Sequence, residues 1–176
     1  MSNAVDAGSS DSGTVLIEAG EPIETAAAWI GHACWAELRF HEVLTTWLAV
    51  EPDVELSQTL WLIRAHRAEL AEAWHRRLPE LREFPRPGFV VPSGDVVSTL
   101  FDEAEGLVDE TAAAHRAALA AAILEGFSAG YRNHLGIAVG PADGPTAESL
   151  ARAIEVTDAD LVRLDPAPSA SVPSLP

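Results

Sequence analysis

Apolar residues recur at helical spacing along most of this chain, and their pattern predicts four long helices and one short helix. Wound at about 100° per residue, the segment 24–50 gathers its apolar side chains on one side. A second helix is expected from Asp53, as its N-cap, to about Pro79. Later segments with the same period cover residues 95–106, 108–135 and 146–164. No segment of useful length alternates apolar and polar residues as a strand would.

The connections between these segments set the expected topology. About three residues link the first two helices, so these helices should form an antiparallel hairpin. The stretch "REFPRPGFVVPSG" is a loop because its prolines and glycines break helices, and Ser93 can cap the helix that follows. A straight helix over residues 95–135 would span about 60 Å, against roughly 40 Å for each of the first two. We therefore expect a break near residues 106–109, and a second loop at "GIAVGPADGP".

These elements predict an all-α domain, a four-helix bundle of two antiparallel hairpins with a crossover loop and a short extra helix. The bundle would occupy residues 23–165 as a single domain, which suits a chain of 176 residues. Residues 1–22 and 166–176 are small, polar or proline-rich, and we expect them to be flexible tails.

The formal net charge of −16 narrows the range of partners. An acidic surface repels phosphate groups and anionic lipids, so we expect no nucleic-acid partner and no membrane partner. No apolar run approaches the roughly 18 residues of a membrane span. The first twenty residues also lack a secretory signal, so the expected location is cytoplasmic. The single cysteine excludes an internal disulfide.

One acid interrupts the apolar stripe of the first helix. Glu37 lies within that stripe, and Cys34 and His41 lie on its flank. In a hairpin that turns near residues 51–52, residue 37 is level with residue 66, so Glu37 should face His66 and Arg67. A carboxylate buried alone costs several kcal/mol or takes up a proton, and it therefore requires such partners.

Three interpretations of this cluster remain open at this point. Glu37 and Arg67 could form a buried ion pair that fixes the pairing of the two helices. Alternatively, Glu37 exchanges a proton with a ligand in an internal cavity, with His66 or His41 as its catalytic partner. The side chains expected to bind that ligand are Arg67, which would hold an anionic group, Cys34, Trp74 and His115. In the third interpretation, the residues that hold iron, manganese or zinc are Glu37, His41, His66 and Asp158.

The stretches "RLPELREF" and "YRNHLGIAVGPADGPTAESLARAI", together with two hairpins, a crossover and inward acids, resemble the small ferritin-like proteins common in actinobacteria. The resemblance covers residues 24–164 and implies a bundle with a di-metal site. Such a site takes one Glu from each of two helices and a Glu-x-x-His from each of the other two. Here the one Glu-x-x-His is Glu72 with His75, and the fourth helix offers Glu155 and Asp158 instead. We therefore predict no metal and no other cofactor, with iron or manganese as the alternative.

The expected function follows from this degenerate pattern. We expect a ferritin-like bundle without a complete ferroxidase site that binds a small organic molecule in an internal cavity. It would act on that molecule by acid–base chemistry, as a tailoring enzyme of specialised metabolism. The alternatives are a di-iron or manganese oxidase or oxygenase, and a non-catalytic accessory protein with a buried Glu–Arg pair.

Three further side chains carry weaker expectations. Tyr131 and His134 lie near the end of their helix, where polar tips commonly reach water. Trp35 faces away from the apolar stripe, and an exposed tryptophan is typical of an oligomer contact, so a homodimer is possible.

Overall fold

The computed structural model describes residues 23–80, 82, 85–137 and 144–164, and within these ranges it is helical with no strand. The all-α class expected from the sequence is confirmed. The five α-helices are α1 (Ile23–Leu48), α2 (Val54–Arg77), α3 (Asp95–Glu105), α4 (Ala113–Ile137) and α5 (Gly144–Leu164). Two 3₁₀ turns, η1 (Arg86–Gly88) and η2 (Glu110–Ala112), precede α3 and α4.

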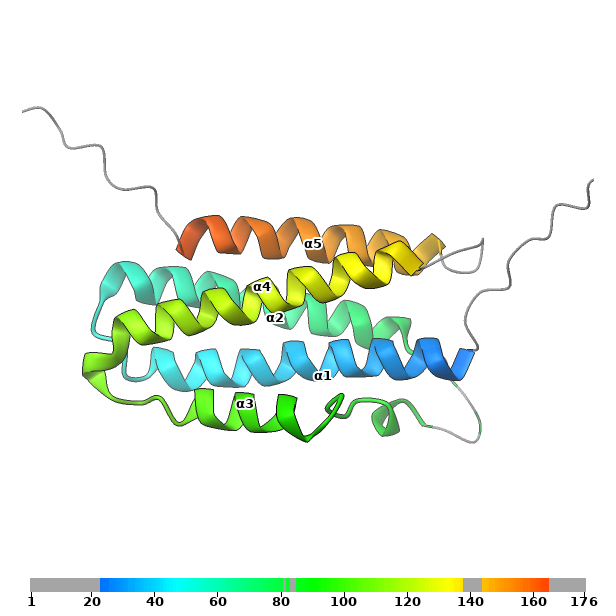
Figure 1. Ribbon diagram of the computed structural model, residues 1–176, viewed down its shortest axis with the longest axis horizontal. Coiled ribbons are helices and arrows are strands. Elements are labelled where there is room, and N and C mark those ends of the chain that lie inside the picture. Colours follow the sequence, from blue (N-terminus) through cyan, green and yellow to red (C-terminus); the bar gives the residue numbers. More distant parts are fainter. Residues whose placement is uncertain (1–22, 81, 83–84, 138–143, 165–176) are drawn as a thin grey trace, which may run out of the picture.

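The four long helices form two antiparallel hairpins that pack side by side (Figure 1). α1 pairs with α2, α4 pairs with α5, and α2 also packs against α5. α1 and α4 run antiparallel, because Trp29 stacks on His134 near one end and Glu51 meets Arg116 near the other. α2 and α4 therefore point the same way, and the segment between them must cross the length of the bundle. That crossover carries α3, which runs along α1 (Figure 1).

Local signals set the helix ends. Asp53 is the N-cap of α2 as expected, and its carboxylate accepts the backbone N–H groups of Glu55 and Leu56. The expectation for Ser93 was wrong, since Gly94 occupies the N-cap of α3 without a side-chain cap. The predicted break follows at Gly106, and α4 starts later than expected. It does so because Arg116 donates to the backbone oxygen of Asp109 and holds the intervening turn.

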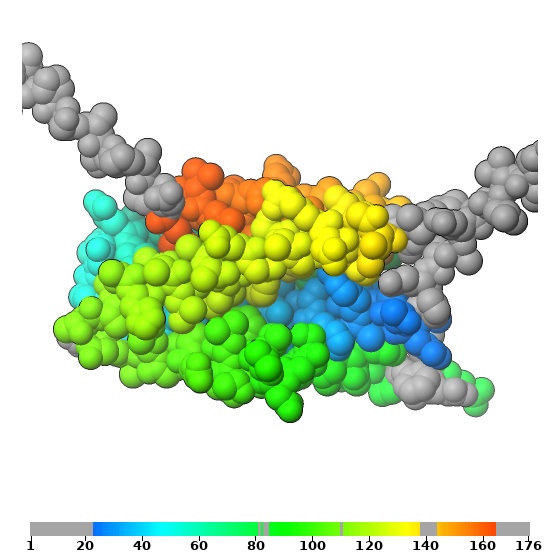
Figure 2. Space-filling view, viewed as in Figure 1, coloured from blue at the N-terminus to red at the C-terminus, as the bar shows by residue number. Residues whose placement is uncertain are grey.

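The core consists of two clusters along the bundle axis. One centres on Phe40, Trp47 and Phe101, and the other on Trp74 and Tyr131. The apolar stripes predicted for α1 and α2 are buried in them. Figure 2 shows α3 and α4 on the same face of the molecule. Beneath that surface, the rings of Phe101 and Phe127 lie 6.4 Å apart.

The expectation that Trp35 is exposed was wrong. Trp35 is partly buried, because α3 covers it and the Phe101 ring meets it edge-on at 5.7 Å. The exposed tryptophan is instead Trp61 on α2, at 56% of its surface. The predicted tails and most of the second loop lie outside the described residues. Among those that are described, no helix is long and apolar enough to cross a membrane.

Candidate functional site

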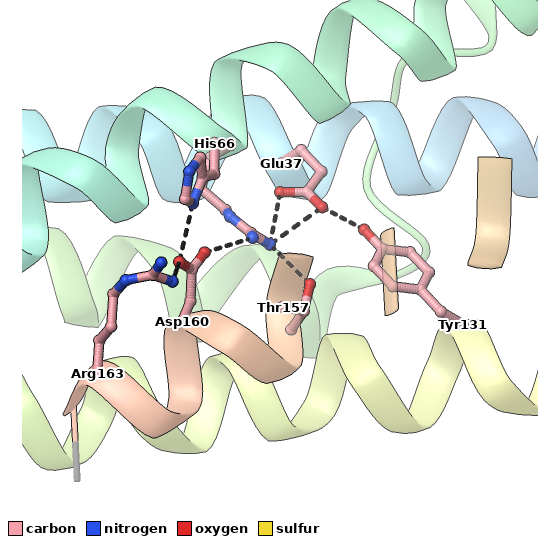
Figure 3. Close-up of polar contacts among 7 residues, drawn as sticks. Glu37, His66, Tyr131, Thr157, Asp160 and Arg163 are labelled. Carbon is pink, nitrogen blue, oxygen red and sulfur yellow. Dashed lines mark hydrogen bonds and ion pairs between the residues drawn. The ribbon is translucent and has the colours of Figure 1, made fainter. Parts of the chain in front are cut away.

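The centre of the bundle holds a polar network built around Arg67. This side chain enters from α2 and is fully buried. One of its terminal nitrogens donates to Glu37 of α1 at 3.3 Å and to the hydroxyl of Thr157 of α5 at 3.2 Å. The other donates to Asp160 of α5 at 2.9 Å. The predicted contact between Glu37 and Arg67 is thus present, but the closer carboxylate is Asp160 (Figure 3).

Asp160 joins the buried network to the surface. Its side chain has no exposed area, yet its oxygens contact His66, Arg67 and Arg163. The Nδ1 atom of His66 lies 2.8 Å from one of its oxygens, and Arg163 reaches the same oxygen at 3.3 Å. The side chains of His66 and Arg163 are 22% and 43% exposed, respectively. His66 and Arg163 are therefore the partners of Asp160 that reach the surface.

Glu37 lies at the other, sealed side of the network. The hydroxyl of Tyr131, from α4, donates to its carboxyl in a short hydrogen bond (Figure 3). Its second oxygen is buried and has no hydrogen-bond partner. Burial raises the pKa of Glu37, although Arg67 and the Tyr131 hydroxyl act in the opposite direction. Burial, followed by the charge of Glu37, raises the pKa of Tyr131 well above its ordinary value.

These contacts give the centre a consistent charge balance. Two carboxyl groups and one guanidinium share the space, and a net charge in a buried site is costly. The Asp160 carboxylate balances Arg67 at the shorter distance, and Glu37 keeps its proton to a higher pH than an exposed glutamate would.

Several side chains predicted for the site lie elsewhere. His41 is half-buried beside Arg64 and Glu42, and burial, with Arg64, lowers its pKa. His66 hydrogen-bonds Asp160 instead of facing Glu37. His115 is exposed, because the buried residue at that turn is its neighbour Arg116.

Two others are close to the network but sealed in the core. Cys34 donates to the backbone oxygen of Ala71 at 3.4 Å, and burial, then the charge of Glu37, raises its pKa to about 11. At neutral pH this raised pKa favours the neutral thiol over the thiolate. Trp74 is 1% exposed and packs against the rings of Trp29 and Tyr131.

The residues of the metal interpretation do not converge. Asp158 points to Ser128 and Arg132 of α4 and is half-exposed. Glu72 pairs with Arg76 on the surface. In the part of the chain that the structure describes, no group of three or more His, Cys, Asp or Glu side chains is arranged to hold a metal ion.

Sequence reasoning missed three members of the network, Tyr131, Thr157 and Asp160. Tyr131 and His134 were expected to reach water, but both are buried because α1 extends past them and Trp29 stacks on His134 at 3.7 Å. The signal for Asp160 was present in α5. Residues 150, 153, 157, 160 and 164 recur at helical spacing, so Asp160 falls in the inward stripe just as Glu37 does in α1.

Three surface hollows lie away from Glu37, on α2, α4 and α5 and on the outer side of α3. One of them has Arg163 in its wall, which also contacts Asp160. No protein-family model, curated protein or solved structure matches this chain. The site is therefore interpreted from its own geometry.

Proposed function

We propose that this chain is a ferritin-like bundle in which an arginine takes the place of the metal and which acts on a small organic molecule by acid–base chemistry. Two antiparallel hairpins joined by a crossover between the parallel helices α2 and α4 support the ferritin-like assignment. The hydrogen bond between His66 and Asp160 is the observation that carries the chemistry.

The donor set around Arg67 does not fit a di-metal centre. Its two carboxyl groups, Glu37 and Asp160, already surround a fixed guanidinium charge at the centre of the bundle. A metal ion between them would meet that charge at close range, and repulsion would oppose its binding. The polar side chains are arranged to bind each other, so the chemistry assigned here uses only proton transfer.

His66 is the proposed point of contact with a substrate, because its side chain is partly exposed whereas Asp160 is fully buried. In the proposed tautomer the Nδ1–H group of His66 donates a hydrogen bond to the buried Asp160 carboxylate, and Nε2 carries no proton and can act as the base. When Nε2 removes a proton from a substrate, the imidazolium is stabilised by Asp160, which Arg67 and Arg163 hold in place. His66 is thus the proposed catalytic base, and Asp160 is a positioning residue.

A base in this setting can be tested with 5-nitrobenzisoxazole, which opens when a base removes one carbon-bound proton. We expect the folded protein to accelerate this reaction. His66→Asn should abolish the acceleration, and Asp160→Asn should lower it by about tenfold or more, since an oriented base commonly contributes factors of this size.

The exposed His115 provides the matched control, because His115→Asn removes an imidazole outside the network. Circular dichroism checks that each variant is folded. Equal rates for wild type, His66→Asn and His115→Asn would contradict the proposal.

A second candidate is a non-catalytic protein whose polar network only fixes helix pairing. It is favoured by the complete burial of Glu37, Arg67 and Asp160 and by their bonds to one another. This candidate predicts that Arg67→Met costs about 3–5 kcal/mol of stability, while Arg67→Met with Asp160→Asn costs much less. It also predicts no dependence of the benzisoxazole reaction on His66.

A further inference from the structure

A groove lies at the end of the bundle where α5 stops. α5 ends at Leu164, while α2 and α4 begin further along the bundle axis, so their first turns have no α5 beside them (Figure 1). Two hollows of about 520 and 510 Å³ lie there. Both include Ala117 and Leu164 in their walls, so they lie next to each other, and the two hollows together are called the groove below.

The floor of this groove is apolar and made of small side chains. α4 contributes alanines, including Ala117 and Ala121, and α5 contributes Leu161 and Leu164. Leu56 of α2 closes the far side. The α4 residues that line the groove, 113–125, span about 18 Å, which matches roughly three turns of a further helix. Ala121 and Glu125 lie beside the last turn of α5, because Leu161 lines the same hollow, so a partner helix would lie along α4.

The rim of the groove is acidic. Asp53 and Glu55 stand at one end and Glu125 stands at the other. The basic residue in its walls is Arg163, whose guanidinium is already in contact with the Asp160 carboxylate. The whole chain has a formal net charge of −16, so a second copy of the same chain would bring like charge to this rim.

We propose that this groove binds a basic amphipathic helix of a partner protein. The apolar face of that helix would cover the alanines of α4, and its Lys or Arg side chains would meet Asp53, Glu55 and Glu125. Charge complementarity selects such a partner over an acidic one and over a second copy. The proposal does not rest on the acid–base function, although Arg163 in the wall of the groove also contacts Asp160.

The test uses the full chain and a labelled 16-residue helical peptide of Lys, Leu and Ala, with leucine at helical spacing. Fluorescence anisotropy should show binding that weakens as salt is added, because exposed ion pairs are screened. A peptide of the same composition in scrambled order should bind at least about tenfold more weakly, a difference of about 1.4 kcal/mol.

Two α4 variants locate the binding. Ala121→Arg places bulk and positive charge in the groove, and it should weaken binding by about tenfold or more. Ala129→Arg makes the same change at an exposed α4 position outside the groove and should leave binding within about twofold. Equal binding to both variants, or equal binding of the scrambled peptide, would overturn the proposal.

Two further measurements would reveal a different occupant of the groove. A dimer in light scattering that Ala121→Arg dissociates would assign the groove to a second copy. A gain of about tenfold in peptide affinity on Val172→Ser with Leu175→Ser would assign it to the C-terminal segment of the same chain. Either result overturns the proposal of a basic partner.

Discussion

At Glu37, burial and the neighbouring guanidinium act on the pKa in opposite directions. Burial is the larger influence, and the pKa of this carboxyl is raised above that of an exposed glutamate. The native state therefore binds this proton more tightly than the unfolded chain does. The resulting stabilisation is fully present at low pH and is lost as the pH rises through the native pKa of Glu37.

The Glu37→Gln variant measures this effect, because glutamine keeps the shape of the protonated acid without its titration. We predict that wild type loses free energy of unfolding relative to Glu37→Gln as the pH rises above about 4.5. Urea denaturation of both proteins across pH 4 to 9, a range of about five units, gives the difference at each pH. If the wild type instead gained stability relative to the variant over this range, Arg67 would be the larger influence and would lower the pKa of Glu37.

At the scale of elements, the crossover is held against α1 by a close backbone approach. Gly31 lies on the face of α1 that meets Phe89, just before α3. A Cβ atom added at Gly31 would lie 2.0 Å from the backbone oxygen of Phe89, so the loop would have to move. Small size at this position lets the crossover close over the helix that carries Glu37.

The matched pair Gly31→Ala and Gly126→Ala tests this contact. Both glycines are helical, but a Cβ atom at Gly126 meets nothing within 4 Å. We predict that Gly31→Ala lowers the free energy of unfolding by about 1–3 kcal/mol, as overpacking does. Gly126→Ala should raise it by about 0.5–1 kcal/mol. Chemical denaturation distinguishes them, and equal stabilisation by both would show that the loop does not rest on α1.

Helix positions were largely predictable from the sequence, because helical periodicity reports directly which side of each helix is buried. The hairpin of α1 and α2, the cap at Asp53 and the break at Gly106 follow from such local signals. The packing of α3 over Trp35 does not, because it depends on the path of a loop across the bundle.

The site was predictable only in part, for a related reason. Contacts between α1 and α2 follow from the register of a short hairpin, and the pair of Glu37 and Arg67 was found in this way. The register of α5 against α2 is set by packing across the bundle, so neither Asp160 nor its bond to His66 was anticipated. His41 lies instead beside Arg64 and Glu42.

At the scale of the whole molecule, the arrangement around Arg67 distinguishes proton chemistry from metal chemistry. We predict that protein produced in medium supplemented with iron and manganese contains well below one metal ion per chain, because Arg67 supplies the central positive charge. Elemental analysis of the purified protein measures this. One or two metal ions per chain in the wild type, absent from Glu37→Ala, would restore the interpretation of the chain as a di-metal oxidase.

The account depends most directly on the bond between His66 and Asp160, and the tautomer of His66 reports it. A long-range ¹H–¹⁵N correlation spectrum, recorded at a pH where the imidazole is neutral, identifies which ring nitrogen carries the proton. We predict that His66 has its proton on Nδ1 in the wild type, and that Asp160→Asn removes this preference. A wild-type His66 with its proton on Nε2, unchanged in Asp160→Asn, would contradict the proposed base.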